Sequence, residues 1–100
     1  MSEKLEPTEA ISLPVKEISD QVKISILLVY GINNPSPDSL ANNALMANFS
    51  FNDYQWIELA FSLTKIIRKY NPHQSLTAPD LQNMVAVQDC IDLVLQKSKP

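Results

Sequence analysis

The sequence predicts an all-α protein with one compact domain, and three observations support this fold class. Apolar residues such as Trp56, Leu59 and Leu63 recur at the spacing of one helix face. The chain has a single Gly and one short strand-like run, whereas a β-sandwich or barrel needs many turns. One hundred residues, of which 45% are hydrophobic, are enough for one compact domain and too few for two.

A first helix is expected to end at Tyr30, and Ser12, Leu13 and Pro14 can open it, because Pro is tolerated in a first turn. Gly31 is well placed as the left-handed residue that ends it. Its apolar stripe consists of Val15, Ile18, Val22, Ile26 and Val29, broadened by Ile24, Leu27 and Leu28. The run from residue 24 to residue 30 could instead be a buried strand, but the length of the stripe favours a helix.

The clearest helix start lies at Asn52. Its side-chain oxygen can accept a hydrogen bond from the backbone N–H of Gln55, whose side chain can reach back to the N–H of Asn52. Phe51 and Trp56 have the spacing at which two apolar side chains clamp a helix start. Asp53 is then the first helical residue, at the positive end of the helix dipole.

This central helix is expected to run from about Asp53 to Tyr70. Its buried positions are Trp56, Leu59, Ala60, Leu63, Ile66 or Ile67, and Tyr70. Basic residues gather in its last turns, where they suit the negative end of the dipole: Lys65, Arg68 and Lys69. The dipeptide Asn71-Pro72 ends it.

The connection from Asn33 to Ser50 is long for a compact domain. A short helix could form between Ser39 and Ala47. Four apolar side chains could pin this loop to the helices: Leu40, Leu45, Met46 and Phe49.

Two helices are expected after the central one. Thr77 with Asp80, and Pro79 between them, predicts a short helix through about Asn83. A last helix is expected from about Ala86 to Lys97, with Asp89 supporting its first turn. Its apolar positions are Val87, Cys90, Ile91, Val94 and Leu95.

Charge and composition exclude several classes of partner. The formal net charge is −3, and no basic face is interleaved with aromatic residues, so we expect neither nucleic acid nor an anionic membrane surface as a partner. No apolar run approaches the roughly 20 residues that span a bilayer. Glu3 and Glu6 lie where a signal peptide needs a positive start and an apolar core, so a cytoplasmic protein is expected. Residues 1–11 are expected to be a flexible tail before a single domain at 12–100.

No constellation of residues predicts an enzyme, a metal or a cofactor. Cys90 is alone and falls on an apolar stripe, and His73 has no second His or Cys nearby. Asp89 and Asp92 lie in the first turns of a helix, where carboxylates favour the dipole more often than they form an acid/base pair.

The predicted order of elements, long helix, long loop, long helix, short helix and helix, resembles the acyl carrier protein family. In the first helix, Val22-Lys23 and Gly31-Ile32 are similar to the family's Val-Lys pair and terminal Gly. In the last helix, the run from Val87 to Asp92 is similar to its Val-Gln-x-x-Ile-Asp. In the central helix, Ile57-Glu58-Leu59 is similar to its Val-Glu-Leu, which places Asn52-Asp53-Tyr54 on its Asp-Ser-Leu. The similarity covers about residues 14–97.

In that family, the serine of Asp-Ser-Leu receives a phosphopantetheine arm that carries acyl groups between enzymes. Here the position is Asp53, which has no hydroxyl to form the phosphodiester, so no loading and no bound cofactor are expected there. The carboxylate suits a first helical turn in any protein, by roughly 0.3–1 kcal/mol, and it could also imitate the phosphate of the arm.

The resemblance thus implies a monomeric four-helix carrier-like protein that docks on enzymes of fatty-acid, polyketide or related acyl metabolism. The docking residues would lie at the start of the second family helix: Asn52, Tyr54, Gln55, Glu58 and Lys65. Tyr54 and Trp56 are expected to pack against the loop and the core. Exposure of either would indicate an anchor for a partner.

Two alternatives remain open at this stage. Ser39, within Asp38-Ser39-Leu40, or Ser50 could carry phosphopantetheine in a functional carrier. The chain could also be an unrelated small helical adaptor that shares only the layout.

Overall fold

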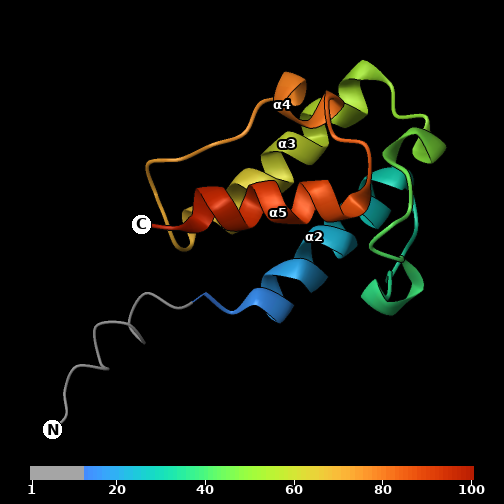
Figure 1. Ribbon diagram of the computed structural model, residues 1–100. Helices are drawn as coiled ribbons and strands as arrows, with labels where there is room; N and C mark the ends of the chain where they lie inside the picture. The colour runs from blue at the N-terminus through green and yellow to red at the C-terminus, as the bar shows by residue number, and fades with distance from the viewer. Residues whose placement is uncertain (1–12) are drawn as a thin grey trace, which may run out of the picture.

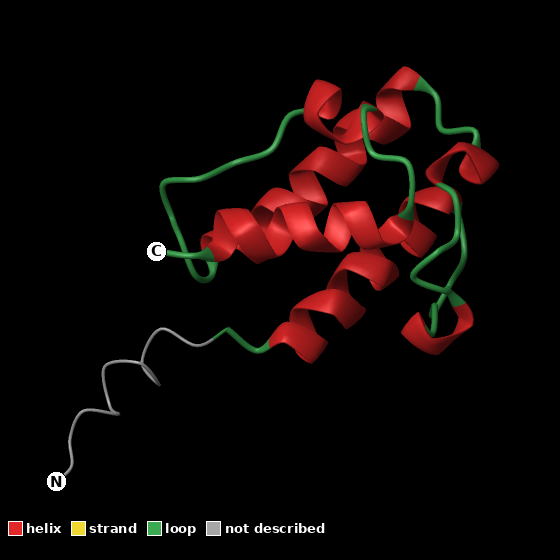
Figure 2. Cartoon of the chain, viewed as in Figure 1, coloured by secondary structure: helices red, strands yellow, loops and turns green. Residues whose placement is uncertain are grey.

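The computed structural model describes residues 13–100, which form three longer helices and one short helix (Figure 1). The helices are α2 (Val15–Tyr30), α3 (Asp53–Arg68), α4 (Ala78–Gln82) and α5 (Val87–Ser98). α3 contacts α2, α4 and α5, and α2 also packs against α5. The described part of the chain contains no strand (Figure 2), so the all-α prediction is confirmed. The predicted tail at residues 1–11, and Ser12, lie outside the described residues.

α2 begins one residue later than Pro14 and ends where the sequence predicts. Pro14 is the flanking residue, and its carbonyl accepts the first helical hydrogen bond from the N–H of Ile18, 3.0 Å away. Gly31 has a φ of 110°, in the left-handed region that glycine adopts without strain. Its N–H donates to the carbonyl of Leu28 at 3.0 Å, which satisfies one of the helix's last carbonyls.

The buried stripe of α2 is narrower than the sequence suggests. Ile18, Val22, Ile26 and Leu27 are buried. Val15 and Leu28 are more than half exposed, so the prediction that they belong to the buried stripe is wrong. α3, α5 and the 3-10 turn at Pro37–Ser39 pack against α2, and the sides of α2 that bear Val15 and Leu28 stay exposed.

α3 begins with the capping arrangement predicted at Asn52. The N–H of Gln55 donates to Asn52 Oδ1 at 2.8 Å, and the N–H of Asn52 donates to Gln55 Oε1 at 3.0 Å. Phe51 and Trp56 meet edge to face, with their ring centroids 5.2 Å apart. The helix ends at Arg68, two residues before the predicted Tyr70.

The loop between α2 and α3 has no α-helix, so the helix suggested at Ser39–Ala47 is wrong. Short 3-10 turns form instead at Pro37–Ser39 and Met46–Phe49. Leu40, Met46 and Phe49 pack into or against the core, whereas Leu45 is 47% exposed.

The exposure of Leu45 has a backbone cause. Leu45 forms an isolated antiparallel bridge with Ala86, and the N–H of Met46 donates to the carbonyl of Val85 at 2.9 Å. Extended backbone points successive side chains to opposite sides, so burying Met46 turns Leu45 outward.

A carboxylate stabilises the start of α4. Asp80 Oδ2 accepts hydrogen bonds from the N–H and the hydroxyl of Thr77, at 2.9 Å and 3.0 Å.

The start of α5 is bound to the long loop. The N–H of Val87 donates to the carbonyl of Ala44 at 2.9 Å, so the loop is attached to the last helix. The buried positions predicted for α5 are confirmed at Val87, Cys90, Ile91 and Val94, and Leu95 is half-buried.

Candidate functional site

Asp53 is the first residue of α3 and is exposed to solvent. Three independent contacts fix the backbone on which it lies: the capping pair of Asn52 and Gln55, the Phe51–Trp56 ring contact, and a bond to α2. The last is the hydrogen bond from Gln55 Nε2 to the carbonyl of Val29, 3.2 Å long. The carboxylate is therefore held at the positive end of α3, directly after the long loop.

An aromatic cluster, consisting of Tyr30, Phe49, Phe51 and Trp56, lies beside this helix start. Tyr30 and Phe49 meet edge to face at 5.1 Å, and Phe49 stacks on Phe51 with ring centroids 5.4 Å apart. Aromatic pairs in these arrangements contribute roughly 0.5–1.5 kcal/mol beyond the area they bury. The cluster links the end of α2, the loop and the start of α3, so it fixes where Asp53 is presented.

Of the predicted docking residues, Asn52, Tyr54, Glu58 and Lys65 are exposed, and Gln55 is half-buried by its capping contacts. Tyr54 is 68% exposed, so the expectation that it packs against the loop is wrong. Tyr54 lies nine residues before the buried Leu63, which places it on the opposite face of α3. Trp56 is half-buried against the core, as expected.

Two further exposed apolar residues, which were not predicted from the sequence, lie on the same side of α3. Ile57 is 46% exposed and Phe61 is 68% exposed. They follow Tyr54 by three and seven residues, which is helical spacing, so the three side chains lie on one face. In the sequence, Ile57 and Phe61 could have been identified from this spacing, because it forms a second apolar stripe opposite Leu59 and Leu63.

Neither alternative serine lies at the start of an α-helix. Ser39 is the last residue of a 3-10 turn, and its Oγ donates to the carbonyl of Ser36 at 2.7 Å. Ser50, which lies between Phe49 and Phe51 in the sequence, has a φ of 50°, in the left-handed region. Both serines are exposed.

The Cys90 thiol is buried. Burial, and to a smaller extent the nearby negative charge of Asp89, raise its pKa to about 12. The thiol is therefore protonated at neutral pH and lacks the thiolate that nucleophilic or metal chemistry needs.

The other ionisable residues named from the sequence form no site. Asp89 and Asp92 hydrogen-bond within α5 or to the residues just before it, and His73 is exposed. Asp89 Oδ2 accepts from the N–H of Ala86, and Asp92 Oδ1 accepts from Gln88 Nε2 at 2.8 Å. His73 is exposed in the turn after α3. Among residues 13–100, no group of three or more His, Cys, Asp or Glu side chains could hold a metal ion.

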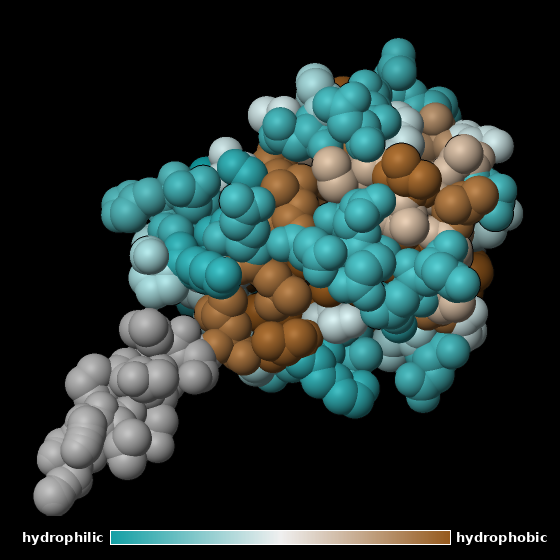
Figure 3. All heavy atoms as spheres, in the orientation of Figure 1, coloured by the Kyte–Doolittle hydropathy of each residue, from teal (hydrophilic) through white to brown (hydrophobic). Residues whose placement is uncertain are grey.

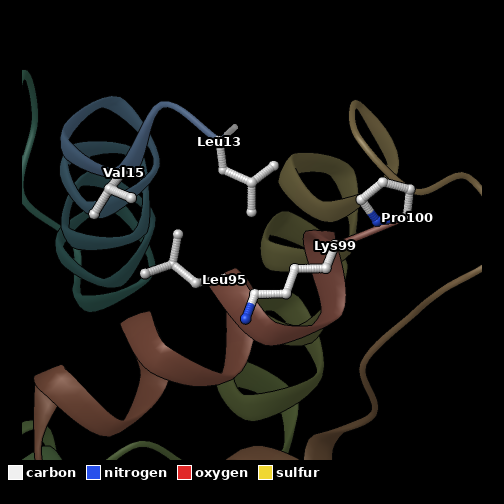
Figure 4. A pocket seen from close by; sticks show the side chains of 5 residues that line it. All are labelled: Leu13, Val15, Leu95, Lys99 and Pro100. Carbon is white, nitrogen blue, oxygen red and sulfur yellow. The ribbon is translucent and has the colours of Figure 1, made fainter. Parts of the chain in front are cut away.

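An open groove lies at the other end of α2, against the end of α5 (Figure 4). Its volume is about 680 Å³, and it is lined by Leu13, Val15, Leu95, Lys99 and Pro100. Figure 3 shows apolar atoms at the surface between α5 and the first turns of α2. Because α2 spans roughly 24 Å and its far end contacts Gln55, the groove is separate from Asp53.

Comparison of the chain with protein-family models, with curated proteins and with solved structures gave no match. Within the described residues, no helix has both the length and the apolar character needed to cross a membrane.

Proposed function

We propose that this chain is a relative of acyl carrier proteins that is not loaded at the usual position and acts through contact with other proteins. Its partners would be enzymes of fatty-acid, polyketide or related acyl metabolism. The observation that carries the proposal is Asp53, an exposed carboxylate on the first residue of the helix that follows the long loop.

The chemistry of arm attachment explains why the residue at position 53 decides whether the chain can be loaded there. Attachment joins a serine hydroxyl to a phosphorus centre and leaves a phosphodiester anion beside the helix. A helix N-terminus stabilises such an anion. Asp53 supplies a permanent negative charge at that place but no hydroxyl, so it reproduces part of the loaded state's charge without any cargo.

The surroundings of Asp53 suit docking. Tyr54 extends into solvent beside it, and an exposed aromatic ring is a common anchor in protein interfaces. Asn52 and Gln55 hold the first turn rigidly, so little conformational entropy is lost on binding. Glu58 and Lys65 add one charge of each sign along the same helix, which affects the rate and choice of encounter.

A loading assay tests the proposal. The purified protein is incubated with coenzyme A and a permissive phosphopantetheinyl transferase, and its intact mass is measured. We expect the wild-type chain to gain nothing. We expect Asp53→Ser to gain one phosphopantetheine group, located at position 53 by peptide mapping, with Asp53→Ala as the matched control that gains nothing.

A triple variant removes the remaining differences from the family's tripeptide. Asn52→Asp, Asp53→Ser and Tyr54→Leu together give Asp-Ser-Leu, and Asp is as good an N-cap as Asn. If this variant folds and is still not modified, the placement of Asp53 at the arm position is wrong. A mass gain by the wild type that Ser39→Ala or Ser50→Ala abolishes would instead establish a working carrier.

A further inference from the structure

The outward face of α3 carries an apolar stripe that no described element covers. Tyr54, Ile57 and Phe61 are 68%, 46% and 68% exposed. The opposite face of the same helix is fully buried at Leu59, Leu63 and Ile67, where α2, α4 and α5 pack. α3 is therefore apolar on two sides, and only one of them is used inside the bundle.

The charges on this face change sign along the helix. Glu58 lies beside the stripe three residues before Phe61, and Lys65 lies beside it four residues after. Both are exposed, and neither forms an ion pair with another residue of the described chain. Arg68 continues the basic half one turn later. Phe61 thus lies between an acidic half and a basic half of the same face.

We propose that this face docks a second copy of the chain, with the two α3 helices antiparallel about a twofold axis at Phe61. The α-helical rise places Glu58 about 4.5 Å to one side of Phe61 and Lys65 about 6 Å to the other. The twofold axis brings Glu58 of each copy beside Lys65 of the other, within about 1.5 Å along the helix direction and on the same flank.

The same symmetry places Tyr54 level with Arg68 of the other copy, because each lies seven residues from Phe61. The guanidinium of Arg68, however, is held by a 3.0 Å hydrogen bond from its Nε to the carbonyl of Gln74, so the Glu58–Lys65 pairs carry the charge complementarity of the dimer. Each Glu58 thus lies beside Lys65 of the other copy, and the two Phe61 rings meet at the axis.

Charge complementarity favours a second copy over a partner whose facing surface carries charge of one sign only. A twofold interface must be complementary to itself, and this face carries both the acidic and the basic half of each pair. A uniformly basic partner would be repelled by Lys65 and Arg68, and a uniformly acidic one by Glu58.

The size of this face of α3 indicates how tightly two copies would bind. One helix stripe is smaller than the roughly 800 Å² per partner of a standard stable interface, so the dimer should be weak, with a dissociation constant of about 0.1–1 mM. The expectation of a monomer would then hold only in dilute solution. The inference does not rest on the family resemblance.

Sedimentation velocity from about 10 µM to about 2 mM tests the inference. We expect a concentration-dependent dimer, and Phe61→Ser should raise its dissociation constant at least tenfold, roughly the loss of a central anchor. Val85→Ser is the matched control, because Val85 is also exposed, at 66%, but lies outside α3. It should leave the dimer unchanged.

Charge reversal identifies the partner as a second copy. Glu58→Lys alone and Lys65→Glu alone should each weaken the dimer about tenfold by opposing like charges. Mixing the two variants should restore association as a heterodimer, and the double variant should restore the homodimer. Circular dichroism checks that each variant is folded.

Three results would overturn the inference: a monomer up to about 2 mM, a dimer insensitive to Phe61→Ser, or no recovery on mixing the charge variants. The assay contains no coenzyme A and no transferase. Its failure would therefore leave the loading experiment unaffected, and the reverse is also true.

Discussion

At the scale of single residues, Asp89 shows how one carboxylate satisfies the backbone donors that directly precede a helix. Ala86 precedes α5 and has no side-chain acceptor. Asp89 Oδ2 instead accepts from the N–H of Ala86 at 2.9 Å and of Val85 at 3.2 Å. Two backbone donors at the start of α5 thus depend on one side chain.

Asp89→Ala should lower the free energy of unfolding by about 1–2 kcal/mol, because it leaves both N–H groups without their acceptor. Asp92→Ala is the matched control: Asp92 is exposed and bonds only to the side chain of Gln88, so its loss should cost under about 0.5 kcal/mol. Urea unfolding of the three proteins measures both values. Equal effects of the two substitutions would show that Asp89 is not a cap.

The Cys90 thiol should resist alkylation in the folded protein. Burial keeps its pKa near 12, so almost no thiolate is present at neutral pH. Iodoacetamide should label Cys90 only after unfolding in guanidinium, as mass spectrometry would show. Labelling of the native protein at the rate of a free cysteine would contradict the burial.

At the scale of elements, α4 depends on the hydrogen bonds that Thr77 donates to Asp80. The backbone bond first, and the side-chain bond second, hold the pKa of Asp80 below its ordinary value of 3.8. A carboxyl group whose pKa is lower in the folded state stabilises the fold above its unfolded pKa. That contribution is lost as the pH falls through the folded pKa.

Asp80→Asn should therefore destabilise the protein near pH 7, by about 1 kcal/mol, as for other lost caps. The difference from wild type should shrink as the pH falls below the ordinary pKa of 3.8, where the unfolded chain takes up a proton first. It should be lost below the lower pKa of the folded state, where the folded wild-type carboxyl group is protonated too. Urea unfolding across this pH range measures the difference. A difference that stays constant with pH would mean that the ionised carboxylate is not what stabilises α4.

The elements also show what the sequence could predict. Local signals were sufficient where side chains act on their own backbone: the Asn52–Gln55 cap, the Gly31 terminator and the Thr77–Asp80 start are all present. The loop was not predictable in this way. Its form depends on pairing between Leu45 and Ala86, which are far apart in the sequence.

Side-chain exposure was also only partly predictable. The spacing of apolar residues predicted the buried face of α3. The exposure of Tyr54 depends on whether the loop folds over it, and residue spacing does not encode this. The position of Asp53 at the start of a helix was predictable because the cap next to it is local. Whether that position has the role it has in acyl carrier proteins is a question of chemistry, which the loading assay addresses.

At the scale of the whole molecule, contacts from several elements hold the start of α3 in place. The aromatic cluster joins α2, the loop and α3, while the loop's bond from Val87 to Ala44 joins the same region to α5. Asp53 is exposed on this framework, and the apolar groove lies at the opposite end of α2. The exposed carboxylate and the groove thus lie at different ends of α2.

The most direct measurement is the intact mass of the protein isolated from the cells that produce it. The proposal predicts the mass of the chain without a phosphopantetheine group, whatever transferases those cells contain. A chain carrying phosphopantetheine on Ser39, Ser50 or any other residue would contradict it.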